Sequence, residues 1–394
     1  RHGPILPGLL DGVKREPMVQ GARSVVSCCD GAGPDETMTR KKIATVSAAA
    51  LNRRGFLRQV VGGAARLGVA SCLPHVDGEW ETCGGEGSCE GEAPEVPAPR
   101  PNRVVEVYDA LAVDDESVEV DALRVAAMVQ AGLLALTGAA DMQDVWDDIL
   151  HGRQPGERVG FKVNCLNAWV PTRPELVRAL VDGLIETGAD PADLFVWDRT
   201  VRELERGGFT EESMGVACVG TKQSSSDDTG PGYECEACCL TDRNIYLAKL
   251  LTQQCDHLIN VAVMKNHLAA GFTGALKNHY GSFSRPGDFH ENCGEHIARL
   301  NALPAITGPS RLFVSDSLIG VCNGDTDKPA DCIPKRLLFS FDPVAIDRRG
   351  LEIRDQMRQA VYDLGPGAPA AYLDRATELG LGAAQYDLQE IDLT

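Results

Sequence analysis

Apolar residues recur along this chain in two spacings from residue 104 onward. Short continuous runs, such as residues 194–198 (Leu-Phe-Val-Trp-Asp), are typical of strands that are buried on both faces. Longer segments, such as residues 174–187, have apolar residues every three or four positions, which is typical of an amphipathic helix. The pattern predicts strands at residues 104–108, 158–164, 194–198, 258–264, 312–316 and 337–341, and helices at 120–136, 141–150, 174–187, 241–253 and 343–359.

Strands that alternate with helices predict the fold class. We expect an α/β fold with a mostly parallel sheet flanked by helices, formed as a single large domain by residues 104–394. In such sheets the ligand site lies at the carboxyl ends of the strands. The residues that follow each predicted strand are therefore the first candidates for chemistry.

Polar side chains stand at five of these predicted strand ends. The positions are Lys162 and Asn164, Asp198, Lys265 to His267, Asp316, and Asp342. A single Asp at the end of a strand often does no more than cap a turn. Five polar strand ends that meet at one edge of a sheet favour a pocket with basic, amide and acidic groups.

The stretch from Met264 to His290 is the richest in chemical groups, with two lysines, three histidines and several close glycines. Glycine-rich backbone beside Lys and Thr suits an anion such as phosphate or carboxylate, although the spacing does not match a nucleotide-binding P-loop. The predicted binding residues for an anionic small molecule are Lys162, Asn164, Lys265, Thr273, Lys277 and Asn278. The predicted catalytic residues, which would move protons or bind a metal, are His267, His279, His290, Asp198 and Asp316.

The N-terminal part carries a different kind of signal. Arg53 and Arg54 precede a weak apolar run rich in Gly and Ala, an arrangement that resembles a twin-arginine export signal. The run closes on Val-Ala-Ser-Cys, which resembles a lipobox with Cys72 as the lipidated residue. The alternative is an ordinary basic pair before a buried helix. The run is too short and too poor in Leu and Ile to span a bilayer as a mature helix.

These signals predict how the chain is divided before its main domain. We expect a non-native or disordered leader at residues 1–37, a twin-arginine signal peptide at 38–71 and an acidic Gly/Pro-rich tether at 72–103. The twin-arginine export machinery would then deliver the protein to the periplasm or cell envelope. A lipid anchor at Cys72 would be its contact with the membrane.

The charge balance narrows the range of partners. Residues 1–71 hold 11 of the 38 Lys and Arg residues but 5 of the 57 Asp and Glu residues, so the rest of the chain carries a formal net charge of −25. A surface of this sign repels nucleic acid and anionic lipid headgroups. We therefore expect no nucleic-acid partner.

Cysteine is abundant, with 14 residues in the chain. Cys235, Cys238 and Cys239 offer three thiols in five residues and could ligate a metal ion or an iron–sulfur cluster, but a cluster needs a fourth ligand. Disulfides in an acidic loop are the alternative that we favour for an exported protein. Residues 323–327 resemble the start of a calcium loop, but the later Gly and Glu are missing, and a loop closed by Cys322 and Cys332 is the simpler interpretation.

Several of these strings resemble the domain-of-unknown-function 362 family. The most specific are Thr-Gly-Ala-Leu-Lys-Asn at 273–278 and Asp-Pro-Val-Ala-Ile-Asp at 342–347, and they occur in the family's order with Gly-Phe-Lys-Val-Asn at 160–164. Some members carry a fused ferredoxin-type module, and others have a twin-arginine leader without it. This chain is similar to the second kind. The resemblance implies a possible metal or iron–sulfur cofactor but no defined reaction.

The sequence therefore supports three functional hypotheses. The first is an exported, membrane-tethered enzyme that binds an anionic small molecule, with a redox reaction as the favoured class because twin-arginine export often carries proteins with cofactors. The second is a non-catalytic lipoprotein that binds a metal or ligand in the same pocket. The third is a surface scaffold stabilised by disulfides, in which the pocket lysines would be dispensable.

Overall fold

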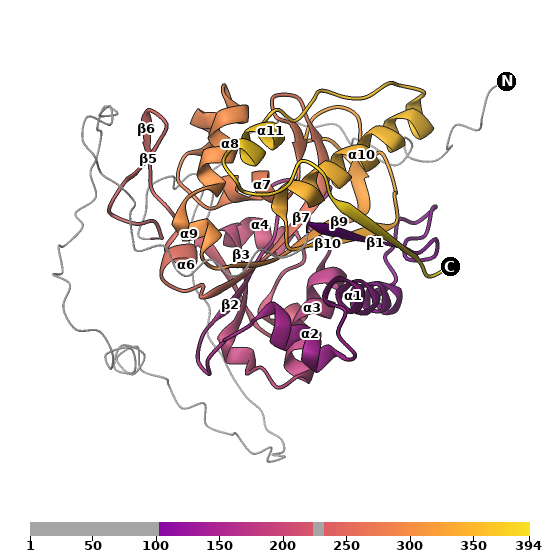
Figure 1. The fold of residues 1–394 in the computed structure, drawn as a ribbon, viewed down its shortest axis with the longest axis horizontal. Coiled ribbons are helices and arrows are strands. Elements are labelled where there is room, and N and C mark those ends of the chain that lie inside the picture. Colours follow the sequence, from indigo (N-terminus) through magenta and orange to yellow (C-terminus); the bar gives the residue numbers. More distant parts are fainter. Residues whose placement is uncertain (1–101, 224–231) are drawn as a thin grey trace, which may run out of the picture. The chain divides into compact units, whose positions relative to one another are not determined.

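The computed structural model describes residues 102–223 and 232–394. The predictions for the leader, the signal peptide, Cys72 and all but the last two residues of the tether lie outside these residues. Within the described part, nine strands form one sheet in the order β11-β1-β10-β9-β7-β2-β3-β4, with β8 paired to β7 (Figure 1). The strands are β1 (Arg103–Tyr108), β2 (Val159–Lys162), β3 (Leu194–Thr200), β4 (Ala217–Lys222), β7 (His257–His267), β8 (Gly271–Thr273), β9 (Ser310–Val321), β10 (Arg336–Ser340) and β11 (Asp387–Asp392).

Five neighbouring strands of this sheet, β4, β3, β2, β7 and β9, run parallel. Strand β10 is antiparallel to both β9 and β1, and β11 is parallel to β1. The predicted mostly parallel α/β fold is therefore confirmed. One consequence of the prediction was wrong, because the reversed direction of β10 places Asp342 at the opposite edge of the sheet from the ends of β2, β3 and β7.

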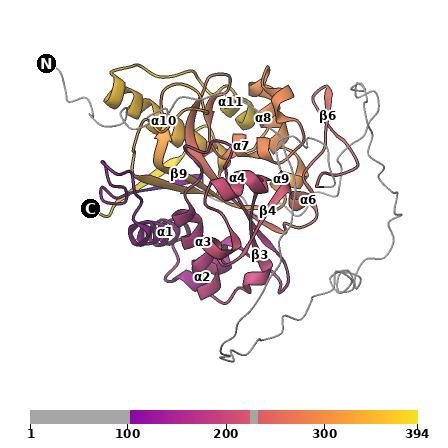
Figure 2. The ribbon, with the colours of Figure 1, turned by 180° about the vertical axis from the view of Figure 1, so that it is seen from behind.

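Helices cover both faces of the sheet, as Figure 1 and the reverse view in Figure 2 show. The helices are α1 (Ala122–Thr137), α2 (Met142–Ile149), α3 (Pro174–Glu186), α4 (Val201–Arg206), α5 (Glu211–Met214), α6 (Lys249–Thr252), α7 (Ala275–Asn278), α8 (Cys293–Asn301), α9 (Pro304–Thr307), α10 (Pro343–Tyr362) and α11 (Tyr372–Glu378). Helices α1 to α3 lie on one side, and α7, α8, α10 and α11 lie on the other.

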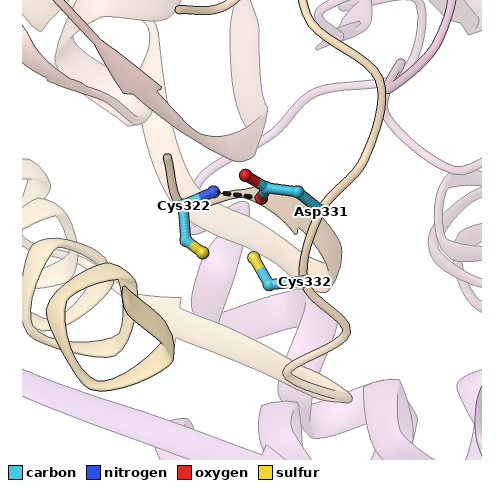
Figure 3. A group of neighbouring side chains, drawn as sticks. All are labelled: Cys322, Asp331 and Cys332. Carbon is cyan, nitrogen blue, oxygen red and sulfur yellow. Dashed lines mark hydrogen bonds between the residues drawn. The ribbon is translucent and has the colours of Figure 1, made fainter. Parts of the chain in front are cut away.

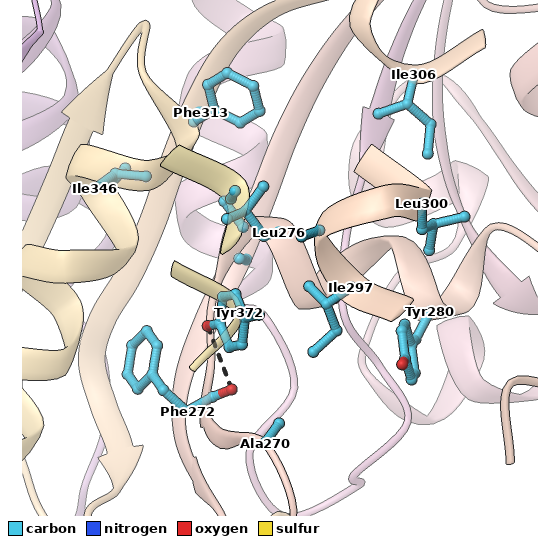
Figure 4. Packing of buried hydrophobic residues seen from close by; sticks show 14 of the residues in the cluster. Ala270, Phe272, Leu276, Tyr280, Ile297, Leu300, Ile306, Phe313, Ile346 and Tyr372 are labelled. Carbon is cyan, nitrogen blue, oxygen red and sulfur yellow. Dashed lines mark hydrogen bonds between the residues drawn. The ribbon is translucent and has the colours of Figure 1, made fainter. Parts of the chain in front are cut away.

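The alternation of side chains along each strand explains the two-sided packing. On β3, Val196 packs into the core under α1 to α3, whereas Phe195 and Trp197 pack into the core on the other face. Figure 4 shows part of this second core, where Tyr372 of α11 donates a hydrogen bond of 3.4 Å to the Phe272 carbonyl of β8. Both faces are apolar, which is why the strands read as continuous apolar runs in the sequence.

Capping residues set several helix boundaries close to those predicted. Asp121 accepts hydrogen bonds from the backbone of the first turn of α1, and Gly138 ends that helix in the left-handed conformation. Asp342 caps α10 in the same way, with Pro343 at the first helical position. The predicted helix at 241–253 was largely wrong. Its first half forms the hairpin strand β6 (Arg243–Ile245), paired with β5 (Cys238–Leu240), and only α6 is helical.

Among the described helices, none alone is long and apolar enough to cross a bilayer. Helices α1 and α2 reach that length and apolar character only when taken together, and the pair is bent by 61°.

Candidate functional site

A small cavity of about 100 Å³ lies where β2, β3 and β7 end. It is lined by Asn164, Leu166, Asn167, Asp198, Arg199, Glu203, Lys265, His267, Thr273, Lys277, Asn278, Tyr280, Gly281, Pro286, His290 and Thr326. Two larger hollows, of about 760 and 380 Å³, lie along β5, β6 and α8 and beside α2. They contain only Cys239 among the predicted site residues, so the small cavity is the candidate site. The predicted convergence of strand ends is thus found for three strands.

A buried ion pair joins two of these strands. Lys162 of β2 donates to Asp198 Oδ1 of β3 at 2.7 Å, and both side chains are almost fully buried. The second Asp198 oxygen accepts from the Cys165 backbone N–H at 2.7 Å. Asp198 therefore neutralises Lys162, which does not line the cavity. This differs from the predicted role of Lys162 as an anion ligand, and its position indicates a structural charge pair instead.

A network of amides holds the base of the site in one orientation. Asn278 Oδ1 accepts from Lys162 and Asn164, at 3.4 and 3.3 Å, and its Nδ2 donates to Asn260 Oδ1 at 2.8 Å. Asn260 Nδ2 in turn donates to His279 Nε2 at 3.3 Å. Fully bonded amides cannot rotate freely, so this network fixes the position of Asn164 and Asn278 at the cavity wall.

His279 belongs to this network and not to the cavity. Its side chain is fully buried, and its Nδ1 lies 3.0 Å from the Ser282 hydroxyl. Burial lowers the pKa of His279 to about 3, with Lys162 adding to the effect. The predicted role of His279 in proton transfer or metal binding does not fit this position. The residue instead positions Asn260.

Two lysines in the cavity have no carboxylate partner among the described residues. Lys265 Nζ donates to Asn164 Oδ1 at 2.8 Å, and its side chain is 1 % exposed. Lys277 Nζ lies 4.4 Å from the centre of the Tyr280 ring. Burial lowers the pKa of Lys265 to about 7 and that of Lys277 to about 8. Two desolvated amines in one small cavity favour the binding of an anion, because an anion stabilises their charged form.

Two histidines form an adjacent part of the wall, with stacked rings whose centres are 5.4 Å apart. His267 Nδ1 accepts from the backbone N–H groups of Ala269 and Ala270, so its proton is on Nε2. Burial, followed by the charge of Lys277, lowers the pKa of His267 to about 3. His290 Nδ1 lies 3.3 Å from the Gly287 carbonyl and must donate to it, which leaves Nε2 as an acceptor. The pair thus offers one donor and one acceptor.

The cavity also contains an unsatisfied polar atom and a tightly fitted glycine. Thr273 Oγ1 is buried and has no hydrogen-bond partner, which is uncommon in native proteins. A methyl group on Gly281 would lie 2.9 Å from both Asp198 Oδ1 and Lys162 Nζ. A glycine is therefore needed where the wall approaches the ion pair, and the Thr273 hydroxyl is free to bind a ligand.

The structure separates Asp316 from the cavity. Its carboxylate accepts from the backbone N–H groups of Arg173 and Leu318, at 2.7 and 3.2 Å, and so supports the start of α3. Burial raises the pKa of Asp316 to about 6. The predicted strand ended at Asp316, but β9 continues to Val321, so Asp316 lies in the middle of the strand and not at its carboxyl end.

The cysteine predictions have mixed outcomes. Cys235, Cys238 and Cys239 are disulfide-bonded, so in this state their sulfurs are not the thiolate ligands of a metal or cluster. Cys322 and Cys332 lie together at the ends of their loop, as expected, but both are free thiols.

Eight residues that line the cavity were not predicted from the sequence. They are Leu166, Asn167, Arg199, Glu203, Tyr280, Gly281, Pro286 and Thr326. Arg199 directly follows Asp198, and it pairs with Glu203 one helical turn later, so the spacing could have identified both. Asn167 and Thr326 come from two irregular loops joined by an Asn167 hydrogen bond to the Thr326 carbonyl, and no periodic pattern marks such contacts.

Comparison with known proteins gives a family match for this part of the chain. A crystal structure from Thermotoga maritima, a structural genomics target, aligns with 62% of this chain and 60% of its own length at 10% identity, with a TM-score of 0.36. Among curated proteins, none has significant sequence similarity to this chain. A family model described as a domain of unknown function (DUF362) matches residues 159–352, which include every residue that lines the cavity. Through these residues, the chain belongs to the domain-of-unknown-function 362 family.

Proposed function

We propose that the cavity binds a small carboxylate or similar anion and that the protein catalyses proton transfer on the bound molecule. The observation that carries this proposal is the pair of desolvated lysines, Lys265 and Lys277, which lack a carboxylate partner among the described residues. The other charges of the cavity wall are already paired, Asp198 with Lys162 and Glu203 with Arg199. The partner that the two lysines lack is therefore expected to come from a ligand.

The size of the cavity limits what can bind. A volume of about 100 Å³ accommodates a carboxylate with a few further atoms, or the charged end of a larger molecule that extends outside. The Thr273 hydroxyl would donate to one ligand oxygen, which would satisfy an atom that is otherwise buried without a partner. The Nε2–H group of His267 would supply a further neutral donor.

The two lysines suit different tasks. At neutral pH, a lysine with a pKa of about 8 is mostly charged, so Lys277 would hold the anion. A lysine with a pKa of about 7 is present in both protonation states, as a general base requires, so Lys265 would accept the proton. His290 Nε2 provides a second acceptor at the same wall. This division does not require a cofactor, and a redox reaction stays a prediction of the sequence alone.

Binding is the first test of this proposal. Calorimetric titration with acetate, pyruvate, oxalate and inorganic phosphate should detect at least one ligand for the natural protein. Lys277→Met should weaken that binding at least about tenfold, because the ligand loses a charged partner in a desolvated site. Lys249→Met, on α6, is a matched control that removes a lysine outside the cavity and should bind normally. Equal binding by all three proteins would refute the site.

Exchange of carbon-bound hydrogen tests the catalytic part. In D2O, the protein should exchange the carbon-bound hydrogen of acetate or pyruvate, as followed by NMR; oxalate and phosphate carry no such hydrogen and test binding alone. Lys265→Met should abolish this exchange. Binding without exchange in the natural protein would refute catalysis of proton transfer and would favour the non-catalytic ligand-binding protein.

We also propose that the protein is exported by the twin-arginine route and tethered through Cys72. The support for this proposal is the sequence of residues 53–72. Cell fractionation of a variant in which both Arg53 and Arg54 are replaced by lysine should show retention in the cytoplasm. Unchanged export of that variant would refute the proposed route.

A further inference from the structure

Two thiols and a carboxylate converge away from the candidate cavity. Cys322 directly follows β9, while Asp331 and Cys332 come from the returning end of the same loop (Figure 3). An antiparallel bridge between Gly320 and Cys332 fixes the two ends against each other. The two sulfurs and a carboxylate oxygen all lie within 4.8 Å of one another. Both cysteines are buried and neither is in a disulfide.

The carboxylate of Asp331 is held in place by three hydrogen bonds. Its Oδ1 accepts from the Cys322 backbone N–H at 2.7 Å, and its Oδ2 accepts from the Asn323 N–H and the Tyr362 hydroxyl, both at 3.0 Å. A carboxylate has about four acceptor positions, so one position on Oδ1 remains for a further partner. Hydrogen bonds of this kind commonly orient the carboxylates that ligate metals.

We propose that Cys322, Asp331 and Cys332 bind one zinc ion, with a water molecule as the fourth ligand. Zinc prefers thiolate, imidazole and carboxylate ligands in a tetrahedron, with Zn–S distances of about 2.3 Å. Such a tetrahedron places its ligand atoms roughly 3.5 to 3.8 Å apart. A small contraction of the observed arrangement is sufficient, and side-chain rotation at the two cysteines can supply it.

The exchange of metal for protons leaves the charge of the site unchanged. Both cysteines are buried and neither is in a disulfide, so each brings one S–H group to the exchange. Binding converts two thiols, one carboxylate and Zn²⁺ into a bis-thiolate zinc carboxylate and two released protons. Two thiols and one carboxylate carry one negative charge, and so do two thiolates, one carboxylate and Zn²⁺. Because the net charge of the site is the same with and without the metal, burial does not oppose the exchange.

A nearby cation matches this negative charge. Arg358 donates to the Cys322 carbonyl at 3.1 Å and to Asn323 Oδ1 at 2.8 Å.

A disulfide between the two cysteines is the competing product. It would leave the fourth acceptor position of the Asp331 carboxylate without a metal partner. The site therefore suits an ion better than a disulfide.

Metal analysis tests the proposal on the full chain. The natural protein and three variants, Cys322→Ser, Cys332→Ser and Cys255→Ser, are equilibrated with zinc under anaerobic conditions, desalted and analysed. Cys255 is a buried free thiol elsewhere in the fold and is the matched control. The natural protein and the control should retain one zinc per chain, and each of the other variants should bind zinc at least about tenfold more weakly. Equal zinc in all four proteins would overturn the proposal.

Cobalt supplies a readout that does not depend on the variants folding. Cobalt(II) bound to the natural protein should show thiolate charge-transfer absorption and the intense visible bands of a tetrahedral site, with release of two protons per ion. Absence of the charge-transfer absorption would overturn the proposal. So would a mass that shows a disulfide between Cys322 and Cys332 in the freshly isolated protein.

Discussion

Anion binding should weaken steeply as the pH rises, because the two cavity lysines lose their charge. With pKa values of about 7 for Lys265 and about 8 for Lys277, both are charged at pH 6. At pH 9 the charged fractions fall to about one in a hundred and about one in ten. If the anion needs both charges, its dissociation constant should increase about a thousandfold between these pH values. If it needs Lys277 alone, the increase should be about tenfold.

Calorimetric titration with acetate or oxalate from pH 6 to pH 9 measures this dependence directly, because these ligands do not titrate in that range. Two buffers of different ionisation enthalpy give the number of protons taken up. Between pH 7 and 9, binding should be accompanied by proton uptake, since the bound anion favours the charged lysines. An affinity that is constant across this range, with no proton uptake, would refute the assignment of the lysines as anion ligands.

Three further perturbations distinguish function from stability. Gly281→Ala should reduce anion affinity at least about tenfold, because the new methyl group meets the wall ion pair, whereas Gly287→Ala, which has open space, should bind normally in the same titration. Lys265→Met should leave the melting temperature of the unliganded protein unchanged or raise it, because the substitution removes a desolvated amine. A large fall in melting temperature would contradict a functional role for that amine. Asp198→Asn should lower the free energy of unfolding by about 3–5 kcal/mol, since Lys162 is left unpaired, and the added change Lys162→Met should restore part of it in denaturant unfolding.

The sequence predicted the fold class and most elements because the described core is apolar on both faces of the sheet. Continuous apolar runs and helical spacing are local patterns, and they identified the parallel strands β2, β3, β7 and β9. The direction of β10 is not a local property. Its apolar run reads like the others, so Asp342 was placed at the wrong edge of the sheet. The hairpin strand β6 was taken for a helix, because a short apolar segment fits both patterns.

The site was predicted in part for the same reason. Lys265, His267 and Asp198 follow apolar runs that do end at one edge, so their convergence could be predicted. Whether a side chain faces the cavity or an internal partner depends on contacts across the sheet. Lys162 is neutralised by Asp198 and His279 is held by Asn260, and neither contact is visible in the spacing of residues. Asp316 was misplaced because the apolar run gave no sign that β9 continues beyond it.

The most direct test of the anion site is a crystal of the protein soaked in bromide, with the anomalous signal used to locate the anions. A bromide ion is expected in the cavity, within hydrogen-bond distance of Lys265 Nζ, Lys277 Nζ and Thr273 Oγ1. Bromide ions found only on the surface, with the cavity empty at the same concentration, would contradict the claim that these lysines form an anion site.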